Sequence, residues 1–154
     1  MIKLSTIENY RSDRERFNPK GDCAVRAFAV FFDINYNVAR EWLNKFNPRD
    51  CVNGTYSVAI EQAMHAYAET RGIEVTKHYP SRNMKVKSLV SQVEKAYISA
   101  RGHATACVNG VHYSNVNQEE ADSKKYRDDA NQFVKSYWTM KVVDVNKYLS
   151  GGVY

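Results

Sequence analysis

The segment DCAVRAFAVFF, residues 22–32, decides how this chain folds. Its apolar residues occupy most faces of a helix, so the helix has to be buried in the protein core. Asp22 is placed to cap the helix N-terminus, and the preceding NPKG (residues 18–21) is a turn that interrupts regular structure. The segment therefore predicts a central, buried helix whose first turn carries Cys23.

Around this segment the apolar patterns predict mainly helices first and strands afterwards. Helical spacing of apolar residues predicts three more helices, at 37–46, 57–70 and 86–95. Alternation of apolar and polar residues predicts strands at 73–79, 97–99, 103–108, 111–115 and 134–143. The charged segment 117–132 has almost no apolar residue and is expected to be a solvated loop or a frayed helix. The order predicts an α+β fold, in which N-terminal helices, with the Cys-bearing helix at the centre, pack on a C-terminal antiparallel sheet, a meander.

Length and composition limit the classes of function. The 154 residues, of which 44% are hydrophobic and 25% charged, predict a single domain over 1–154. The net charge of +5 is spread along the chain, so a nucleic-acid partner is not indicated. No apolar run approaches the length of a membrane span, and the first ten residues do not resemble a signal peptide. We therefore expect a cytoplasmic protein without a membrane partner.

The three cysteines, Cys23, Cys51 and Cys107, are an odd number, which argues against a disulfide framework in a reducing compartment. No CxxC or HxxxH spacing is present, so neither a metal site nor a cofactor is expected. A reactive thiol is therefore the chemistry to consider. Cys23 is the candidate because backbone amides and the helix dipole at a helix N-terminus lower a thiol pKa, and Gly21 lets a substrate carbonyl approach the sulfur. The alternative for Cys23 is a small buried apolar residue, which is what most cysteines are.

A nucleophilic cysteine needs a base, and four histidines are available. His65 and His78 are expected to be solvated or packing residues, and His112 is expected to be exposed in the hairpin. His103 begins a strand whose next residues, 104–106, are small enough to pack closely against the Cys-bearing helix. We therefore predict that His103 is the base.

The turn at residues 109–110, Asn-Gly, determines which residue orients His103. A two-residue turn pairs His103 with Val116 and puts Ser114 on the same face of the sheet. A three-residue loop with a bulge instead pairs His103 with Asn115. Because an amide orients an imidazole better than a hydroxyl does, we predict Asn115 as the orienting residue, with Ser114 as the alternative.

Attack on a carbonyl also needs hydrogen-bond donors for the developing oxyanion. The backbone amide of Cys23 is one candidate donor. The side-chain amide of Asn18 is the nearest upstream candidate for the second donor, and it is equally interpretable as a turn residue before Pro19.

The segments GDCAVRAFA (21–29) and GHATACVNGVHYSN (102–115) together resemble the small papain-like cysteine peptidase domains found in many bacteriophage genomes. In such domains a Gly-Asp-Cys-x-x-Arg-Ala segment opens the central helix, and a Gly-His strand followed by a turn glycine carries the base and its orienting residue. The order of cysteine, histidine and then asparagine or aspartate is also the papain-like one. The resemblance covers these two motifs and the order of elements, about half of the chain.

This resemblance implies a papain-like fold with Cys23 as nucleophile, His103 as base and Asn18 as oxyanion donor. It also implies that Asp22 and Arg26 are structural residues near the site, with Arg26 one helical turn after Cys23 and bonded to a nearby carboxylate or carbonyl. In such domains an Asp often occupies the place where this chain has Ser114.

We therefore predict a cysteine peptidase or a related acyl-transfer hydrolase that cleaves an amide or isopeptide bond in a protein or peptide. If the chain is viral, it acts in the host cytoplasm. One alternative is a catalytically inactive papain-like scaffold that binds a host protein, for which the eleven tyrosines and two tryptophans would suit an interface. Another is a peptidoglycan amidase of the CHAP type, since CHAP domains also place a cysteine at a helix N-terminus and a Gly-His on a strand.

Overall fold

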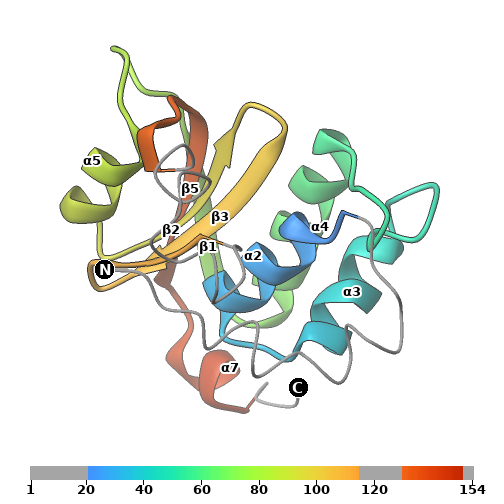
Figure 1. Cartoon of the computed structure of the whole chain (residues 1–154). Coiled ribbons are helices and arrows are strands. Elements are labelled where there is room, and N and C mark those ends of the chain that lie inside the picture. Colours follow the sequence, from blue (N-terminus) through green and yellow to red (C-terminus); the bar gives the residue numbers. More distant parts are fainter. Residues whose placement is uncertain (1–20, 115–129, 151–154) are drawn as a thin grey trace.

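The computed structural model describes residues 21–114 and 130–150 of the chain. Within these residues, helices and an antiparallel sheet form a mixed α+β arrangement (Figure 1), which confirms the predicted class at this level. The helices are α2 (Cys23–Phe32), α3 (Tyr36–Asn44), α4 (Ser57–Thr70), α5 (Val86–Gln92) and α7 (Val145–Ser150). The strands are β1 (Ile73–His78), β2 (Lys95–Ala100), β3 (His103–Val108), β4 (Val111–Tyr113) and β5 (Val134–Val142).

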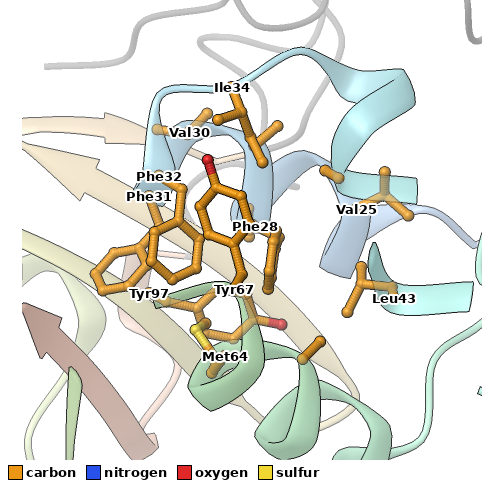
Figure 2. Packing of buried hydrophobic residues seen from close by; sticks show 14 of the residues in the cluster. Val25, Phe28, Val30, Phe31, Phe32, Ile34, Leu43, Met64, Tyr67 and Tyr97 are labelled. Atoms are coloured by element: carbon orange, nitrogen blue, oxygen red, sulfur yellow. The ribbon is translucent and has the colours of Figure 1, made fainter. Parts of the chain in front are cut away.

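Helix α2 packs on the sheet against β3 and β2 and contacts α3 on its other side, while α4 packs beside it on β1 and also contacts α3 (Figure 1). All of its residues after Cys23 are buried, as expected for a helix that is apolar on most faces. The rings of Phe28 and Phe32 lie 4.8 Å apart between centroids and both pack against Tyr67 of α4, while Phe31 packs against Tyr97 of β2 (Figure 2). Burying one such side chain contributes about 1.5–3 kcal/mol, so this cluster holds α2 firmly in place.

The sheet is covered on both faces because side chains of a strand alternate between them. One face packs against α2 and α4 through a row of inward residues: Val75, Tyr97, Ala104, Ala106 and Trp138. The other face packs against α5 and forms a second, smaller core: Ala96, Ile98, Cys107 and Val134 with Val86, Leu89 and Val90 of the helix. Helix α2, whose first residue is Cys23, therefore packs in the larger of the two cores.

The strand order is β1-β5-β2-β3-β4, with every neighbouring pair antiparallel. Only β2, β3 and β4 form the predicted meander. Strand β5 inserts between β1 and β2, where Trp138 pairs with Lys77 on one side and with Tyr97 on the other. Local alternation reveals that β5 is a strand, but it does not reveal which strands it pairs with.

The β3–β4 hairpin has a two-residue turn. Asn109 and Gly110 both have positive φ angles, 50° and 80°, as the tight hairpin turn requires. Val108 pairs with Val111, and Ala106 pairs with Tyr113. The three-residue loop, which would bring position 115 opposite His103, is therefore not formed.

The helix bounds agree with the sequence patterns to within a few residues, and α4 agrees at both ends. Helix α5 ends at Gln92, earlier than expected, because β2 already begins at Lys95. Helix α7 is not predicted by the sequence patterns. It has only six residues, and Asp144 caps it by accepting a hydrogen bond of 3.0 Å from the backbone amide of Lys147. None of the helices in the described part of the chain is long and apolar enough to cross a membrane.

Candidate active site

Cys23 is half-buried at the first position of α2. The chain just before it is fixed, because the backbone amide of Gly21 donates a 2.9 Å hydrogen bond to the carbonyl of Val52. The first bond within the helix runs from the amide of Arg26 to the carbonyl of Asp22, at 3.0 Å. The sulfur therefore lies at the positive end of the helix dipole, which favours a thiolate.

His103 meets Cys23 across the interface between α2 and β3. The two side chains are hydrogen-bonded, and the backbone of Ala104 also bonds to the Cys23 sulfur. Burial by itself raises the pKa of the Cys23 thiol. The hydrogen bond and the charge of His103, the Ala104 bond and the charge of Arg26 outweigh burial and lower that pKa below the ordinary value of a thiol. The pair is therefore suited to form a thiolate and an imidazolium.

The other side of the His103 ring faces a backbone carbonyl. Its Nε2 atom lies 3.3 Å from the carbonyl oxygen of Ser114. A carbonyl only accepts hydrogen bonds, so in this contact Nε2 carries the proton, and Nδ1 is the ring nitrogen that can accept a proton from Cys23. The hydroxyl of Ser114 is buried and has no hydrogen-bond partner among the described residues.

Of the two residues predicted to orient His103, the structure describes only Ser114. Ser114 contacts His103 through its backbone carbonyl, not through its hydroxyl. Asn115 lies outside the described residues. The register that would have set Asn115 opposite His103 is not the one formed, because the turn has two residues and not three.

Asp22 connects the first turn of α2 to neighbouring side chains. It occupies the N-cap position, as expected, but its side chain makes no capping bond. Instead, its Oδ2 atom accepts a 2.9 Å hydrogen bond from the Tyr36 hydroxyl, and its Oδ1 atom lies 3.1 Å from Nε of Arg26. All three side chains are buried. The buried ion pair and the tyrosine link the start of α2 to α3 directly beside the nucleophile.

Cys23 and His103 line a cavity of about 730 Å³. Its floor is made by three small residues that are neighbours on adjacent strands, since Ser99 pairs with Ala104 on one side and Ser136 on the other. Larger side chains at these positions would fill the cavity. Its other walls come from the residue before Asp22 and the loop before α4, from the first half of α4, and from charged or aromatic side chains of the sheet and of the residue after β1: Gly21, Gly54, Ser57, Glu61, Lys77, Lys135 and Tyr79.

Tyr97 also lines this cavity and was not predicted as a site residue. Its hydroxyl is fully buried and has no hydrogen-bond partner among the described residues. Burial and the nearby charge of Cys23 raise the pKa of Tyr97 well above its ordinary value. The strand pattern of residues 97–99 was the only available signal, and it shows neither which strands neighbour Tyr97 nor that its hydroxyl lacks a partner.

The other two cysteines lack the surroundings of Cys23. Burial, with Asp50 adding to it, raises the pKa of Cys51 to about 12, and burial raises the pKa of Cys107 to about 11. Neither forms a disulfide within the described residues, and both are fully buried. Their chemistry at neutral pH is that of small apolar residues, which is the alternative considered for Cys23.

The other three histidines make contacts with residues other than Cys23. His65 is exposed, with its ring 5.4 Å from that of Trp138, and His78 stacks on Tyr137 at 4.8 Å. The expectation that His112 is exposed is wrong. His112 is 2% exposed because it pairs with Cys107 on the sheet face that α5 covers, and its Nε2 atom lies 3.0 Å from the Thr105 hydroxyl.

Asn18, the candidate oxyanion donor, lies outside the described residues. Within residues 21–114 and 130–150, no group of three or more His, Cys, Asp or Glu side chains is placed to hold a metal ion. Comparison with known proteins gives no match to a family model, to a curated protein or to a solved structure. The functional assignment therefore depends on the geometry and chemistry of this site.

Proposed function

We propose that this protein is a papain-like cysteine hydrolase that cleaves an amide or isopeptide bond in a polypeptide through an acyl-enzyme on Cys23. The observation that carries the proposal is the hydrogen-bonded pair of Cys23 and His103 at the wall of a large cavity. A thiol at a helix N-terminus, with a lowered pKa and an imidazole partner, has the properties of a cysteine nucleophile.

The roles of the two residues follow from their contacts. The Cys23 thiolate attacks the substrate carbonyl carbon, and the carbonyl electron pair moves to oxygen. His103, which holds the proton taken from Cys23, donates it to the leaving nitrogen as the carbonyl re-forms and the C–N bond breaks. In the second half of the cycle His103 takes a proton from water, which attacks the thioester and releases Cys23.

The size and the lining of the cavity are the reasons for proposing a polypeptide substrate. Its volume of about 730 Å³ is within the range of ligand-binding pockets and holds a short stretch of extended chain. Gly21, Gly54 and Gly102 leave the walls near Cys23 free of side chains, so a substrate backbone can approach the sulfur closely.

The relationship to phage-encoded papain-like peptidases is part of the same proposal. It is supported by the Gly-Asp-Cys start of α2, the Gly-His start of β3 and their contact in space. None of the three cysteines forms a disulfide within the described residues, which suits a reducing cytoplasm as the site of action.

The direct test is acylation by p-nitrophenyl acetate, with release of p-nitrophenolate followed spectroscopically and the acylated residue identified by mass spectrometry. We expect a burst with the acetyl group on Cys23, no burst for Cys23→Ala, and a rate reduced about 100-fold or more for His103→Ala. Cys51→Ala serves as the matched cysteine control and should keep the burst. Acetylation of another residue, or equal release by Cys23→Ala, would contradict the proposal.

Cleavage of amides needs a second measurement. Incubation with a mixture of unfolded proteins, followed by peptide sequencing, should give new termini for the wild type and none for Cys23→Ala. An inactive scaffold that binds a host protein would give neither the burst nor the new termini. A CHAP-type amidase would give the burst and no new termini, but would release peptide stems from purified peptidoglycan.

A further inference from the structure

The hydroxyl of Tyr97 is a hydrogen-bond donor without a partner in the described residues, although the side chain is fully buried. Leaving a buried polar group unpaired costs stability, so buried hydroxyls normally have partners. Such a group facing a cavity is a natural place for a ligand to supply the missing acceptor. Tyr97 is one of the residues that line the cavity of Cys23 and His103.

The position of Tyr97 is fixed by the sheet and by α2. On β2 it pairs with Ala106 on one side and with Trp138 on the other. Its ring packs edge-on against Phe31, with the centroids 6.5 Å apart. It lies two residues before Ser99, so its side chain is on the same sheet face as the small residues of the cavity floor.

Two further features define what the hydroxyl can do. Tyr97 and Cys23 line the same cavity, and the charge of Cys23 contributes to raising the pKa of Tyr97. Burial and that charge both favour the protonated phenol, which keeps the hydroxyl a neutral donor while the thiolate forms. A fixed donor in a water-poor site is the kind of group that stabilises a developing oxyanion.

We propose that the Tyr97 hydroxyl donates a hydrogen bond to the substrate carbonyl oxygen as thiolate attack turns it into an oxyanion. The inference rests on the proposed function and adds a catalytic residue to it. As the S–C bond forms, the carbonyl electron pair moves to the oxygen that faces Tyr97 and the backbone amide of Cys23. When the pair returns, the C=O bond re-forms, and the leaving group departs with its proton from His103.

Tyr97→Phe tests this role, because it removes the hydroxyl and keeps the ring packed on Phe31. In p-nitrophenyl acetate the only group that reacts with Cys23 is the ester carbonyl, so its acylation rate reports on oxyanion stabilisation. We expect Tyr97→Phe to lower that rate about 100-fold, the effect of removing one oxyanion donor. Alkylation of Cys23 by iodoacetamide forms no oxyanion, so its rate should stay within about twofold of the wild type.

If the Tyr97 hydroxyl served only to stabilise the fold, Tyr97→Phe would lower the thermal midpoint of unfolding. Since the hydroxyl has no partner to lose among the described residues, the thermal midpoint of Tyr97→Phe should equal or exceed that of the wild type. Tyr137→Phe is the matched control, because Tyr137 lies on the opposite face of the sheet, stacked on His78. Its acylation rate should not change.

Two outcomes would overturn the role of Tyr97 while leaving the proposed function intact. Acylation of Tyr97→Phe at the wild-type rate would show that the hydroxyl does not stabilise the oxyanion. An equal fall in acylation and alkylation would show that Tyr97 acts on the thiolate instead. Failure of the proposed function is distinguishable, because then wild-type Cys23 itself would form no acyl-enzyme.

Discussion

The imidazole Nε2 atom of His103 lies 3.3 Å from the backbone carbonyl oxygen of Ser114, the residue that follows strand β4. A main-chain atom therefore orients this side of the ring. The position of that carbonyl depends on the β3–β4 hairpin, whose two-residue turn sets the register between the strands. The identity of the side chain at position 114 matters less for the site than the path of the backbone.

Ser114→Ala should therefore leave the reactivity of Cys23 unchanged. The substitution keeps the carbonyl and removes a buried hydroxyl that has no partner in the described residues. We expect the acylation rate to stay within about threefold of the wild type and the free energy of unfolding to be equal or higher. A tenfold loss of acylation with unchanged stability would show that the hydroxyl, not the carbonyl, orients His103.

Tyr36→Phe should destabilise the fold by about 1.5–3 kcal/mol, since it removes the 2.9 Å hydrogen bond from the Tyr36 hydroxyl to the buried Asp22 carboxylate. Urea denaturation measures this loss. The control is Tyr79→Phe, because Tyr79 is 70% exposed and its substitution should change stability by less than about 0.5 kcal/mol. Equal effects of the two substitutions would mean that the Asp22–Tyr36 bond does not hold the start of α2.

Gly72→Ala should destabilise the fold more than Gly110→Ala, although both glycines have positive φ angles, 63° and 80°. A left-handed backbone costs alanine about 1–2 kcal/mol at either position. At Gly72 a Cβ atom would also lie 2.6 Å from the backbone oxygen of Asp144, whereas nothing lies within 4 Å at Gly110. Chemical denaturation should separate the two variants by at least about 1 kcal/mol. Equal stabilities of the two variants would show that the backbone at Asp144 can move away from a Cβ atom at position 72 without a cost in free energy.

Ser99→Leu should block the cavity without removing the nucleophile, because Ser99 is one of the three small residues of the floor. We expect reversible capture of Cys23 by a short peptide aldehyde to be lost, while alkylation by the much smaller iodoacetamide continues. Ser91→Leu, on the exposed side of α5, is the matched control and should keep both reactions. Unchanged capture by Ser99→Leu would show that the peptide does not lie on this floor.

The sequence predicts the parts of the site that depend on local patterns. The apolar residues after Asp22 specify a buried helix, and the Asn109-Gly110 turn specifies the hairpin that follows His103. The small residues after His103 indicate the close approach of β3 to α2, and Ala104 and Ala106 do lie in the core of α2.

Features that depend on contacts between residues far apart in the sequence could not be predicted. The insertion of β5 between β1 and β2 leaves no local pattern, and it brings Ser136 and Trp138 into the cavity. The burial of His112 follows from α5 covering its face of the sheet, which no alternation within a three-residue strand reveals. Asp22 has the residue type of a helix cap, yet its partners are a tyrosine of α3 and Arg26.

The proposed mechanism requires His103 to hold Cys23 as a thiolate, and this can be measured by the pH dependence of Cys23 alkylation by iodoacetamide. Because only the thiolate reacts, the rate falls as pH falls through the pKa of Cys23. In the wild type this fall should lie below the ordinary thiol pKa of about 8.5, since the contacts with His103 lower the pKa.

In His103→Ala the fall should move to higher pH, to the ordinary value or above it, because burial then acts with much less opposition. His78→Ala is the matched control, since His78 stacks on Tyr137 away from Cys23, and its profile should match the wild type. We expect the profile to shift to higher pH only when His103 is removed. A wild-type profile centred at or above the ordinary thiol value, and unmoved in His103→Ala, would contradict it.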